Sequence, residues 1–412
     1  MTHVLFFAAL LALPLFGLWT WRFAFPARVA VAGAAGALTL AVAMAVLSLV
    51  HVPWTRITLL VILAASLWSG GLLARRFFAR FRRAESPPLH KDVHWYILAF
   101  LALSAYGALT ARESAGDLHF FWGPKAIHFA NARGFDMSFL ANAANPNPDY
   151  PPLLPLVYAW ADIAAGGFSW WGAVLSGVLF LAGSIAIVRG FTGDDLGTLL
   201  FAATMAWCYA VGYVPGGAEP PLLFFETLTL CALTFMDDSR DRDILTAIGL
   251  AGAAFTKVEG ATFVIAVVIA MLVLRRKRVF RVAAPAIALI AAWLIFVIAG
   301  GLVGGYSSAK NGLHLSALPE ILRLLWQSAK YRIAALPWIV PLLLLYFRRA
   351  ALPLLVALLT LGATVFFYLH TSDPGWWISA SAPRVLLTPL TALLIAVLQS
   401  RADGVVPERK EA

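Results

Sequence analysis

Four ionisable side chains stand at the ends of long apolar segments of this sequence, at positions where charge is costly. The two acidic residues are Asp117 and Glu219, and the two basic residues are Lys257 and Arg384. A carboxylate at a boundary between water and an apolar medium can act as a general base toward a hydroxyl group. A guanidinium group binds a phosphate through two parallel hydrogen bonds, and an ammonium group binds it as a point charge. If the four side chains converge, the sequence predicts proton abstraction beside an anion-binding pocket.

Each of these residues also has a structural interpretation. Asp117 precedes a predicted helix, and aspartate is a favoured N-cap residue. Lys257 can form an ion pair with Glu219 or Glu259, or extend its ammonium group to a membrane surface. The residue types alone do not decide between these interpretations and a functional one. Further candidates for substrate binding are Lys125, His128, Tyr150, Glu259 and His370, with the basic residues of the segment 310–332 in reserve.

The bulk composition is that of a protein embedded in a lipid bilayer. Of its 412 residues, 61% are hydrophobic and 13% are charged, and the mean hydropathy is +0.82. Soluble domains carry about 25% charged residues. Several apolar runs, such as 29–52 and 350–370, reach the roughly 17–25 residues that a helix needs to cross a bilayer. The sequence therefore predicts an all-α integral membrane protein that crosses the inner (plasma) membrane many times.

The basic residues predict how the chain is oriented. The runs 75–83 and 275–281 directly follow apolar segments, which is typical of short cytoplasmic loops and not of a nucleic-acid site. Both runs are cytoplasmic only if the apolar segment 150–165 lies on the membrane surface or re-enters it. This interpretation gives about 13 transmembrane helices, with the N-terminus outside. The predicted spans are 4–19, 29–52, 57–74, 96–111, 170–188, 196–214, 220–236, 244–256, 260–274, 282–303, 333–347, 350–370 and 385–398.

On this topology the candidate residues all lie at the extracytoplasmic face, which is where we expect the site. The loop 112–168 is the longest polar interruption of the chain and is expected to contain an amphipathic helix. Its residues Phe121, Ala126 and Phe129 are expected to rest on the membrane. The loops 304–332 and 370–384 are predicted on the same face. On the opposite face, the mixed-charge segment 237–243 is predicted to be a solvated loop and not a metal site.

The chain divides into three parts by composition. Residues 1–95 hold three predicted transmembrane helices and a basic loop, residues 96–400 hold the remaining helices with the candidate site, and residues 401–412 form a charged cytoplasmic tail. Cys208 and Cys231 both lie in apolar segments, where cysteine is usually a small buried hydrophobic residue. The sequence has no zinc-ligand spacing, phosphate-binding glycine loop or serine-hydrolase motif.

Four short motifs, in this order, carry a resemblance to a known family. They are Gly116-Asp117 followed by an aromatic-rich helix, Tyr150-Pro151-Pro152-Leu153, Glu219-Pro220-Pro221 together with Thr256-Lys257-Val258-Glu259-Gly260, and Pro383-Arg384 with Pro389. The arrangement resembles integral membrane glycosyltransferases of the GT-C fold, which use polyprenyl-phosphate sugars. The resemblance covers roughly residues 96–400. Many members have paired acidic residues at the first motif and a soluble domain after the last span, and this chain has neither.

The resemblance implies a specific reaction and role for each residue. A monosaccharide would pass with inversion from a polyprenyl-phosphate donor to a glycan, lipid or protein acceptor on the extracytoplasmic face. Asp117 would be the general base, Glu219 would position the acceptor or the base, and Lys257 and Arg384 would hold the donor phosphate. It implies no cofactor, and the single acidic residue at the first motif leaves a divalent cation open. The alternatives are a transporter or flippase for a lipid-linked or anionic solute, and a non-catalytic assembly subunit.

Overall fold

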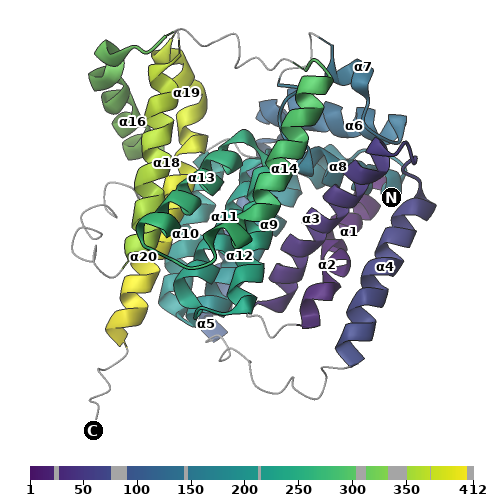
Figure 1. Cartoon of the computed structure of the whole chain (residues 1–412), viewed down its shortest axis with the longest axis horizontal. Coiled ribbons are helices and arrows are strands. Elements are labelled where there is room, and N and C mark those ends of the chain that lie inside the picture. The colour runs from purple at the N-terminus through teal and green to yellow at the C-terminus, as the bar shows by residue number, and fades with distance from the viewer. Residues whose placement is uncertain are drawn as a thin grey trace.

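The computed structural model is all-helical, with no β-strand among the residues that it describes (Figure 1). Six helices are long and apolar enough to cross a bilayer, namely α3, α5, α9, α14, α18 and the continuous run formed by α19 and α20. A helical membrane protein is therefore confirmed. The structure describes residues 1–22, 27–75, 91–142, 147–211, 215–302, 312–332, 350–371 and 373–405.

The described helices occur along the chain in the following order. Those of the first half are α1 Thr2–Leu11, α2 Leu13–Phe16, η1 Leu18–Arg22, α3 Arg28–Leu49, α4 Arg56–Arg75, α5 Lys91–Thr110, η3 Arg112–Ser114, η4 Leu118–Trp122, α6 Gly123–Ala132, α7 Met137–Leu140, α8 Leu153–Ala165, α9 Trp170–Thr192 and α10 Asp195–Val211. Those of the second half are α11 Glu219–Phe235, α12 Arg240–Thr256, α13 Val258–Val273, α14 Val279–Ala299, η5 Leu315–Ala317, α16 Leu318–Arg332, α18 Ala351–Leu369, α19 Pro374–Val385 and α20 Leu387–Val405.

Some of the predicted elements are wrong. The predicted first span 4–19 is interrupted after Leu11, and α2 carries Pro14 in its first turn, where proline is tolerated because the amide hydrogen has no helical partner there. The loop predicted at 304–332 contains the helix α16 over its second half. The predicted span 333–347, most of the basic run 75–83, and the last seven residues of the tail lie outside the described residues.

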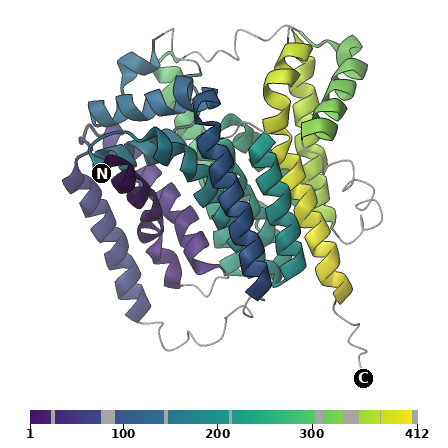
Figure 2. The same ribbon diagram turned by 180° about the vertical axis from the view of Figure 1, so that it is seen from behind.

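The helices α6 and α8 lie across one end of the long helices (Figures 1 and 2). The 13 residues of α8 extend about 20 Å, which is too short for the roughly 30 Å core of a bilayer. This length agrees with a surface or re-entrant position for 150–165. The prediction that Phe121, Ala126 and Phe129 rest on the membrane is wrong, because all three are buried. They pack inward against α8 and its neighbours, and Phe120 is the aromatic residue that is exposed.

The antiparallel helices α11 and α12, joined through residues 236–239, pack against each other at the centre of the bundle. α12 ends at Thr256, Lys257 adopts an extended conformation, and α13 begins at Val258. The turn is tight because Gly260 lies against the backbone of Ala253, where a Cβ atom would come within 1.8 Å of the carbonyl oxygen. The sharp reversal keeps Lys257 at the start of α13 and next to the N-terminus of α11.

Candidate functional site

The structure brings five of the predicted residues into one cluster of charged side chains. Arg384 forms ion pairs with Asp117 and, at 3.8 Å, with Glu219. Lys257 donates a hydrogen bond to Glu219 over 2.8 Å and lies 2.9 Å from the carboxylate of Glu259. The cluster, which we call the Asp117–Arg384 cluster, joins segments from η4, α11, the α12–α13 turn and α19.

Asp117 occupies the N-cap position of η4 but does not cap it. Its side chain accepts no hydrogen bond from the backbone of the helix that follows and instead accepts one from Arg384, 267 residues further along the chain. The predicted cap therefore does not form, and the carboxylate is engaged in a tertiary contact. About two fifths of the Asp117 side chain stays exposed, so an incoming molecule can still reach it.

Glu219 and Lys257 lie deeper and are almost completely buried. Glu219 is the first residue of α11, and the loop before it is held by Tyr158 of α8, whose hydroxyl group donates to the carbonyl oxygen of Gly216. A buried charge is tolerated only when it is paired and hydrogen-bonded. Glu219 and Lys257 are paired and hydrogen-bonded to each other. The ion pair proposed above as the structural interpretation of Lys257 is therefore present.

The charges of the cluster do not cancel. Three carboxylates face two basic groups, so one carboxylate is left without a matching positive charge. Both basic groups are already paired, so an anion can bind only if it replaces a carboxylate as the partner of Lys257 or Arg384. A cation or a hydrogen-bond donor can bind to a carboxylate without breaking an ion pair. The accessible pair formed by Asp117 and Arg384 is the one that can open.

A cavity of about 330 Å³ adjoins the cluster. It contacts the cluster through Glu259 and through Ser381 and Val385, which flank Arg384 on α19. Its wall mixes apolar side chains with hydroxyl groups, which suits a ligand that is part polar and part hydrocarbon. The lining residues are Asp149, Tyr150, Val258, Glu259, Thr262, Thr360, Ala363, Thr364, Phe367, Ser381, Val385 and Thr388.

Two carboxylate oxygen atoms on the cavity wall, and a third on a residue that contacts the wall, are buried and have no hydrogen-bond partner among the described residues. Asp149 and Glu259 line the cavity and contribute Oδ1 and Oε2, respectively. The third atom is Oε2 of Glu226, whose other oxygen accepts a hydrogen bond from the cavity residue Thr388 over 2.8 Å. A buried acceptor without a donor costs roughly 1–3 kcal/mol. A ligand rich in hydroxyl or amine donors would remove this cost.

The loop that carries Asp149 is fixed from both sides. Lys125 donates a hydrogen bond to the carbonyl oxygen of Asn147 over 2.7 Å, and Trp293 donates one to the carbonyl oxygen of Asp149 over 2.6 Å. Tyr150 is buried against the rings of Phe121 and Trp122. Asp149 therefore faces the cavity on a loop held by backbone contacts.

Burial changes the acidity of two groups at this loop. Burial lowers the pKa of Lys125 to about 7, and the nearby charge of Asp149 opposes this change only in part. Burial also raises the pKa of Asp149, against the smaller opposing effects of a backbone hydrogen bond and of Lys125. A carboxylate with a raised pKa is a better proton acceptor than an exposed aspartate, so Asp149 belongs among the candidate catalytic groups.

Two predicted residues have no contact with the cluster or the cavity among the described residues. His128 lies 3.2 Å from the carboxylate of Asp136 and stacks on Phe139. His370 follows the last residue of α18, and its Nδ1 atom is 2.9 Å from the carbonyl oxygen of Phe366. Both contacts are local to their own segments.

Asp149, Glu226 and Thr388 were not predicted. Asp149 directly precedes the Tyr150-Pro151-Pro152 motif, so the motif itself was a signal for it. Glu226 is seven residues after Glu219, which places both on one face of α11, and an acidic residue inside an apolar helix is a functional candidate by default. Thr388 carried no sequence signal, because threonine is common in apolar helices.

Comparisons with family models, with curated proteins and with solved structures found no match to this chain. Among the described residues, no group of three or more histidine, cysteine, aspartate or glutamate side chains is placed to hold a metal ion. The Asp117–Arg384 cluster agrees with this finding, since its carboxylates receive basic side chains. The site is therefore interpreted from its own geometry.

Proposed function

We propose that this protein is a glycosyltransferase of the GT-C type, with about 13 transmembrane helices and its active site at the extracytoplasmic face of the plasma membrane. It transfers a monosaccharide, with inversion, from a polyprenyl-phosphate donor to a glycan, lipid or protein acceptor. The observation that carries the proposal is the cavity itself. Its wall carries hydroxyl groups, unpaired carboxylate oxygen atoms and apolar side chains, and through Glu259 and Val385 it adjoins the basic side chains of Lys257 and Arg384.

The donor phosphate would bind at Arg384 and Lys257. Arg384 is the accessible group of the two, and its guanidinium plane matches two phosphate oxygens. As the sugar leaves, negative charge grows on the phosphate, and fixed positive groups in a partly dry site stabilise that charge. Lys257, held by Glu219 and Glu259, contributes a fixed positive charge without having to move.

The acceptor hydroxyl would lose its proton to Asp117. In the absence of substrate the carboxylate of Asp117 accepts a hydrogen bond from Arg384, so this guanidinium group occupies it. When the donor phosphate takes Arg384, the carboxylate of Asp117 is released next to the reacting sugar. Asp149, on the cavity wall, accepts hydrogen bonds from other hydroxyl groups and is the second candidate for the base.

The excess of carboxylates bears on whether a divalent cation takes part. Mg²⁺ in proteins commonly binds one or two carboxylates together with substrate phosphate. Glu259 and Asp149 offer unpaired oxygen atoms at the cavity, whereas Asp117 and Glu219 receive basic side chains. Transfer that stops on chelation of divalent cations and returns with Mg²⁺ would assign an ion to the donor phosphate.

A transporter for a lipid-linked or anionic solute is the second candidate, and Glu226 favours it. This carboxylate lies two turns inside α11, is completely buried, and has one oxygen without a partner among the described residues. Ionisable groups within membrane helices often belong to transport pathways. The remaining charged groups of the site lie at helix ends, which favours chemistry at the membrane surface.

Reconstitution tests the two functions against each other. The purified chain is placed in vesicles with a polyprenyl-phosphate sugar that carries radiolabel in the sugar. A transferase releases polyprenyl phosphate and moves the label to an acceptor, with Asp117→Asn vesicles as the control. Label that becomes protected inside the vesicles while the donor stays intact would replace the transferase by a transporter.

A further inference from the structure

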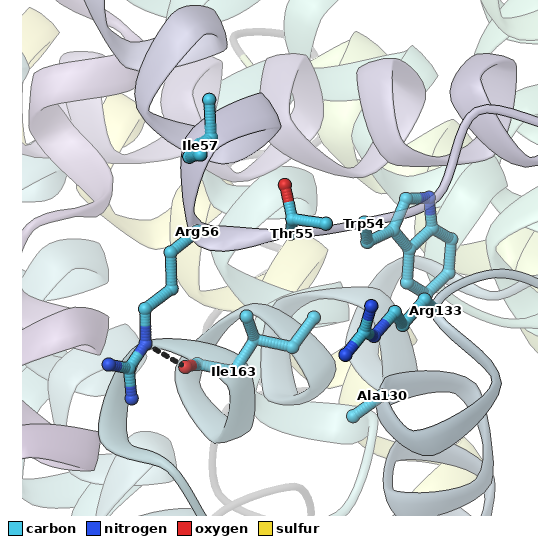
Figure 3. Close-up of a pocket in the computed structure, with 7 residues that line it drawn as sticks. All are labelled: Trp54, Thr55, Arg56, Ile57, Ala130, Arg133 and Ile163. Carbon is cyan, nitrogen blue, oxygen red and sulfur yellow. Dashed lines mark hydrogen bonds between the residues drawn. The ribbon is translucent and has the colours of Figure 1, made fainter.

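A second cavity lies away from the Asp117–Arg384 cluster and carries two arginine side chains. It has a volume of about 370 Å³ and is lined by Arg56 and Arg133 together with Trp54, Thr55, Ile57, Ala130 and Ile163. Figure 3 shows the two guanidinium groups with Ile163 between them. The cavity opens at the start of α4 and the end of α6, at the same end of the molecule as α7 and α19 (Figure 1).

Trp54 forms the floor of this cavity and connects the two segments that carry the arginine residues. Trp54 is buried, with its ring edge-on to Phe129 and Phe135, and its indole nitrogen donates to the carbonyl oxygen of Met44 over 2.8 Å. The backbone nitrogen of Trp54 donates to the carbonyl oxygen of Arg133, also over 2.8 Å. One residue therefore ties the segment that carries Arg56 to the end of α6.

Neither arginine forms an ion pair with a carboxylate among the described residues. The Nε atom of Arg56 donates to the carbonyl oxygen of Ile163 over 3.1 Å, which orients the guanidinium group over the end of α8. The side chain of Arg133 has no hydrogen bond there. The nearest acidic residue in sequence, Asp136, caps α7 and pairs with His128. Two positive charges in one hollow repel each other, so an anion between them is favoured.

The side of α4 next to this cavity is apolar and exposed. Ile57, Leu60, Val61 and Trp68 are more than half exposed and recur at the spacing of one helix face. In a protein that crosses a bilayer, such a face lies against lipid chains. Arg56 begins the helix, at the level where the lipid headgroups meet the chains.

We propose that this cavity binds the phosphate group of an anionic membrane phospholipid, with its acyl chains along the exposed face of α4. Arg56 and Arg133 contact the phosphate oxygens from two sides, and Trp54 connects the segments that carry them. The site needs neither the cavity at the Asp117–Arg384 cluster nor the proposed transfer reaction. The ligand must carry both a negatively charged group for the two arginine residues and hydrocarbon chains for the exposed face of α4.

Lipid binding to the purified full-length chain in neutral detergent tests the proposal. Phosphatidylglycerol is titrated, and the bound lipid molecules are counted by native mass spectrometry, with phosphatidylcholine in parallel. One tightly bound phosphatidylglycerol is expected, and its affinity should fall at least about tenfold in Arg56→Gln/Arg133→Gln, since each charged hydrogen bond lost weakens binding by about this factor. The matched control, Arg276→Gln/Lys277→Gln, removes the same charge from exposed positions between α13 and α14 and should bind as the wild type.

Each other outcome has a definite meaning. An unchanged affinity in the double variant, an equal loss in the control, or equal binding of phosphatidylcholine would overturn the proposal. Inorganic phosphate at the same concentrations should not displace the lipid, and displacement would assign the cavity to free phosphate. Arg133→Gln alone guards against misfolding, because no hydrogen bond of that side chain is lost, and it should give a smaller decrease in affinity.

Discussion

The helices α11 and α12 carry a cluster of charged side chains at each end, and the two clusters differ in their surroundings. At one end lies the Asp117–Arg384 cluster. At the other end, Arg242 pairs with Asp238 over 2.8 Å, and Arg278 pairs with Asp243 over 3.1 Å. We call this second group the Arg242 cluster. The predicted solvated loop at 237–243 is wrong for two of its members, because Arg242 and Asp243 are buried.

Both clusters contain carboxylates paired with basic side chains, but they differ in the empty space next to them. The Asp117–Arg384 cluster adjoins a cavity with unpaired carboxylate oxygens on its wall. Neither cavity described above is lined by a residue of the Arg242 cluster. The Arg242 cluster ties the start of α12 to the start of α14. Both clusters contain a buried carboxylate oxygen atom without a hydrogen-bond partner among the described residues, Glu259 Oε2 in the first and Asp243 Oδ1 in the second. The feature that distinguishes the Asp117–Arg384 cluster is therefore the cavity beside it.

The largest expected difference between the clusters is in activity. In Asp117→Asn, which retains the shape of the side chain, sugar transfer in the vesicle assay should fall about 10²–10⁴-fold because the general base is lost. The melting temperature should change little, since Asp117 is partly exposed and its ion pair is worth little in water. Asp243→Asn is the matched control and should show the reverse pattern. Its transfer rate per folded molecule is retained, and its unfolding free energy falls by roughly 3–5 kcal/mol because a buried ion pair loses one partner.

Normal turnover in Asp117→Asn would remove this residue from the role of base. In that case Asp149→Asn becomes the decisive variant, since Asp149 is the other carboxylate that faces the cavity. If both variants transfer sugar normally, the difference between the two clusters is not one of catalysis.

A smaller effect is expected when the charge of the accessible cluster is kept and its geometry is changed. Arg384→Lys keeps the positive charge but loses the planar group that contacts two phosphate oxygens. Transfer efficiency should fall about tenfold, mainly as a higher KM for the polyprenyl-phosphate donor. Arg278→Lys in the Arg242 cluster should leave KM unchanged. A fall in kcat alone for Arg384→Lys would contradict the assignment of Arg384 to donor binding.

The cavity itself can be filled without touching a charge. Ala363 lies on the cavity wall within α18, and Ala363→Leu adds three carbon atoms to the space. KM for the donor should rise severalfold, since overpacking a site typically costs about 1–3 kcal/mol. Ala288→Leu, at an exposed position of α14, is the control and should behave as the wild type. An unchanged KM in Ala363→Leu would show that the donor does not use this cavity.

Hydrophobicity predicted that the chain is helical and contains apolar helices long enough to cross a bilayer. Long uninterrupted apolar runs become helices in any case, because a bilayer satisfies no backbone hydrogen bonds. The burial of Phe121 and Phe129 was not predictable in the same way. An amphipathic helix has an apolar face, and the sequence does not say whether lipid or protein covers that face. Here α8 covers it.

The sequence predicted the charged residues of the candidate site but not the cavity beside them. The positions of Asp117, Glu219, Lys257 and Arg384 at the ends of apolar segments were enough to predict that they lie together. A charged side chain is costly in lipid, and pairing with an opposite charge lowers that cost. The contributions of Asp149 and Thr388 depend on how the loop before α8 and the helices α13, α18 and α20 are placed around the cavity. That packing depends on contacts between segments far apart in the sequence, which no local pattern predicts.

The smallest expected effect is on the pH dependence of stability, and it concerns the difference between two buried lysine residues. Lys257 has two carboxylate partners, whereas Lys125 has no ion pair among the described residues. Burial lowers the pKa of Lys125 to about 7 in the folded chain, whereas an unfolded lysine has a pKa of about 10.4. Between these values the unfolded chain binds one more proton, so stability should rise with pH across this window. Lys125→Met should remove that rise, and the exposed control Lys277→Met should retain it. Melting temperatures in detergent at several pH values between 7 and 10 measure the difference, and parallel curves for Lys125→Met and wild type would mean that Lys125 stays charged.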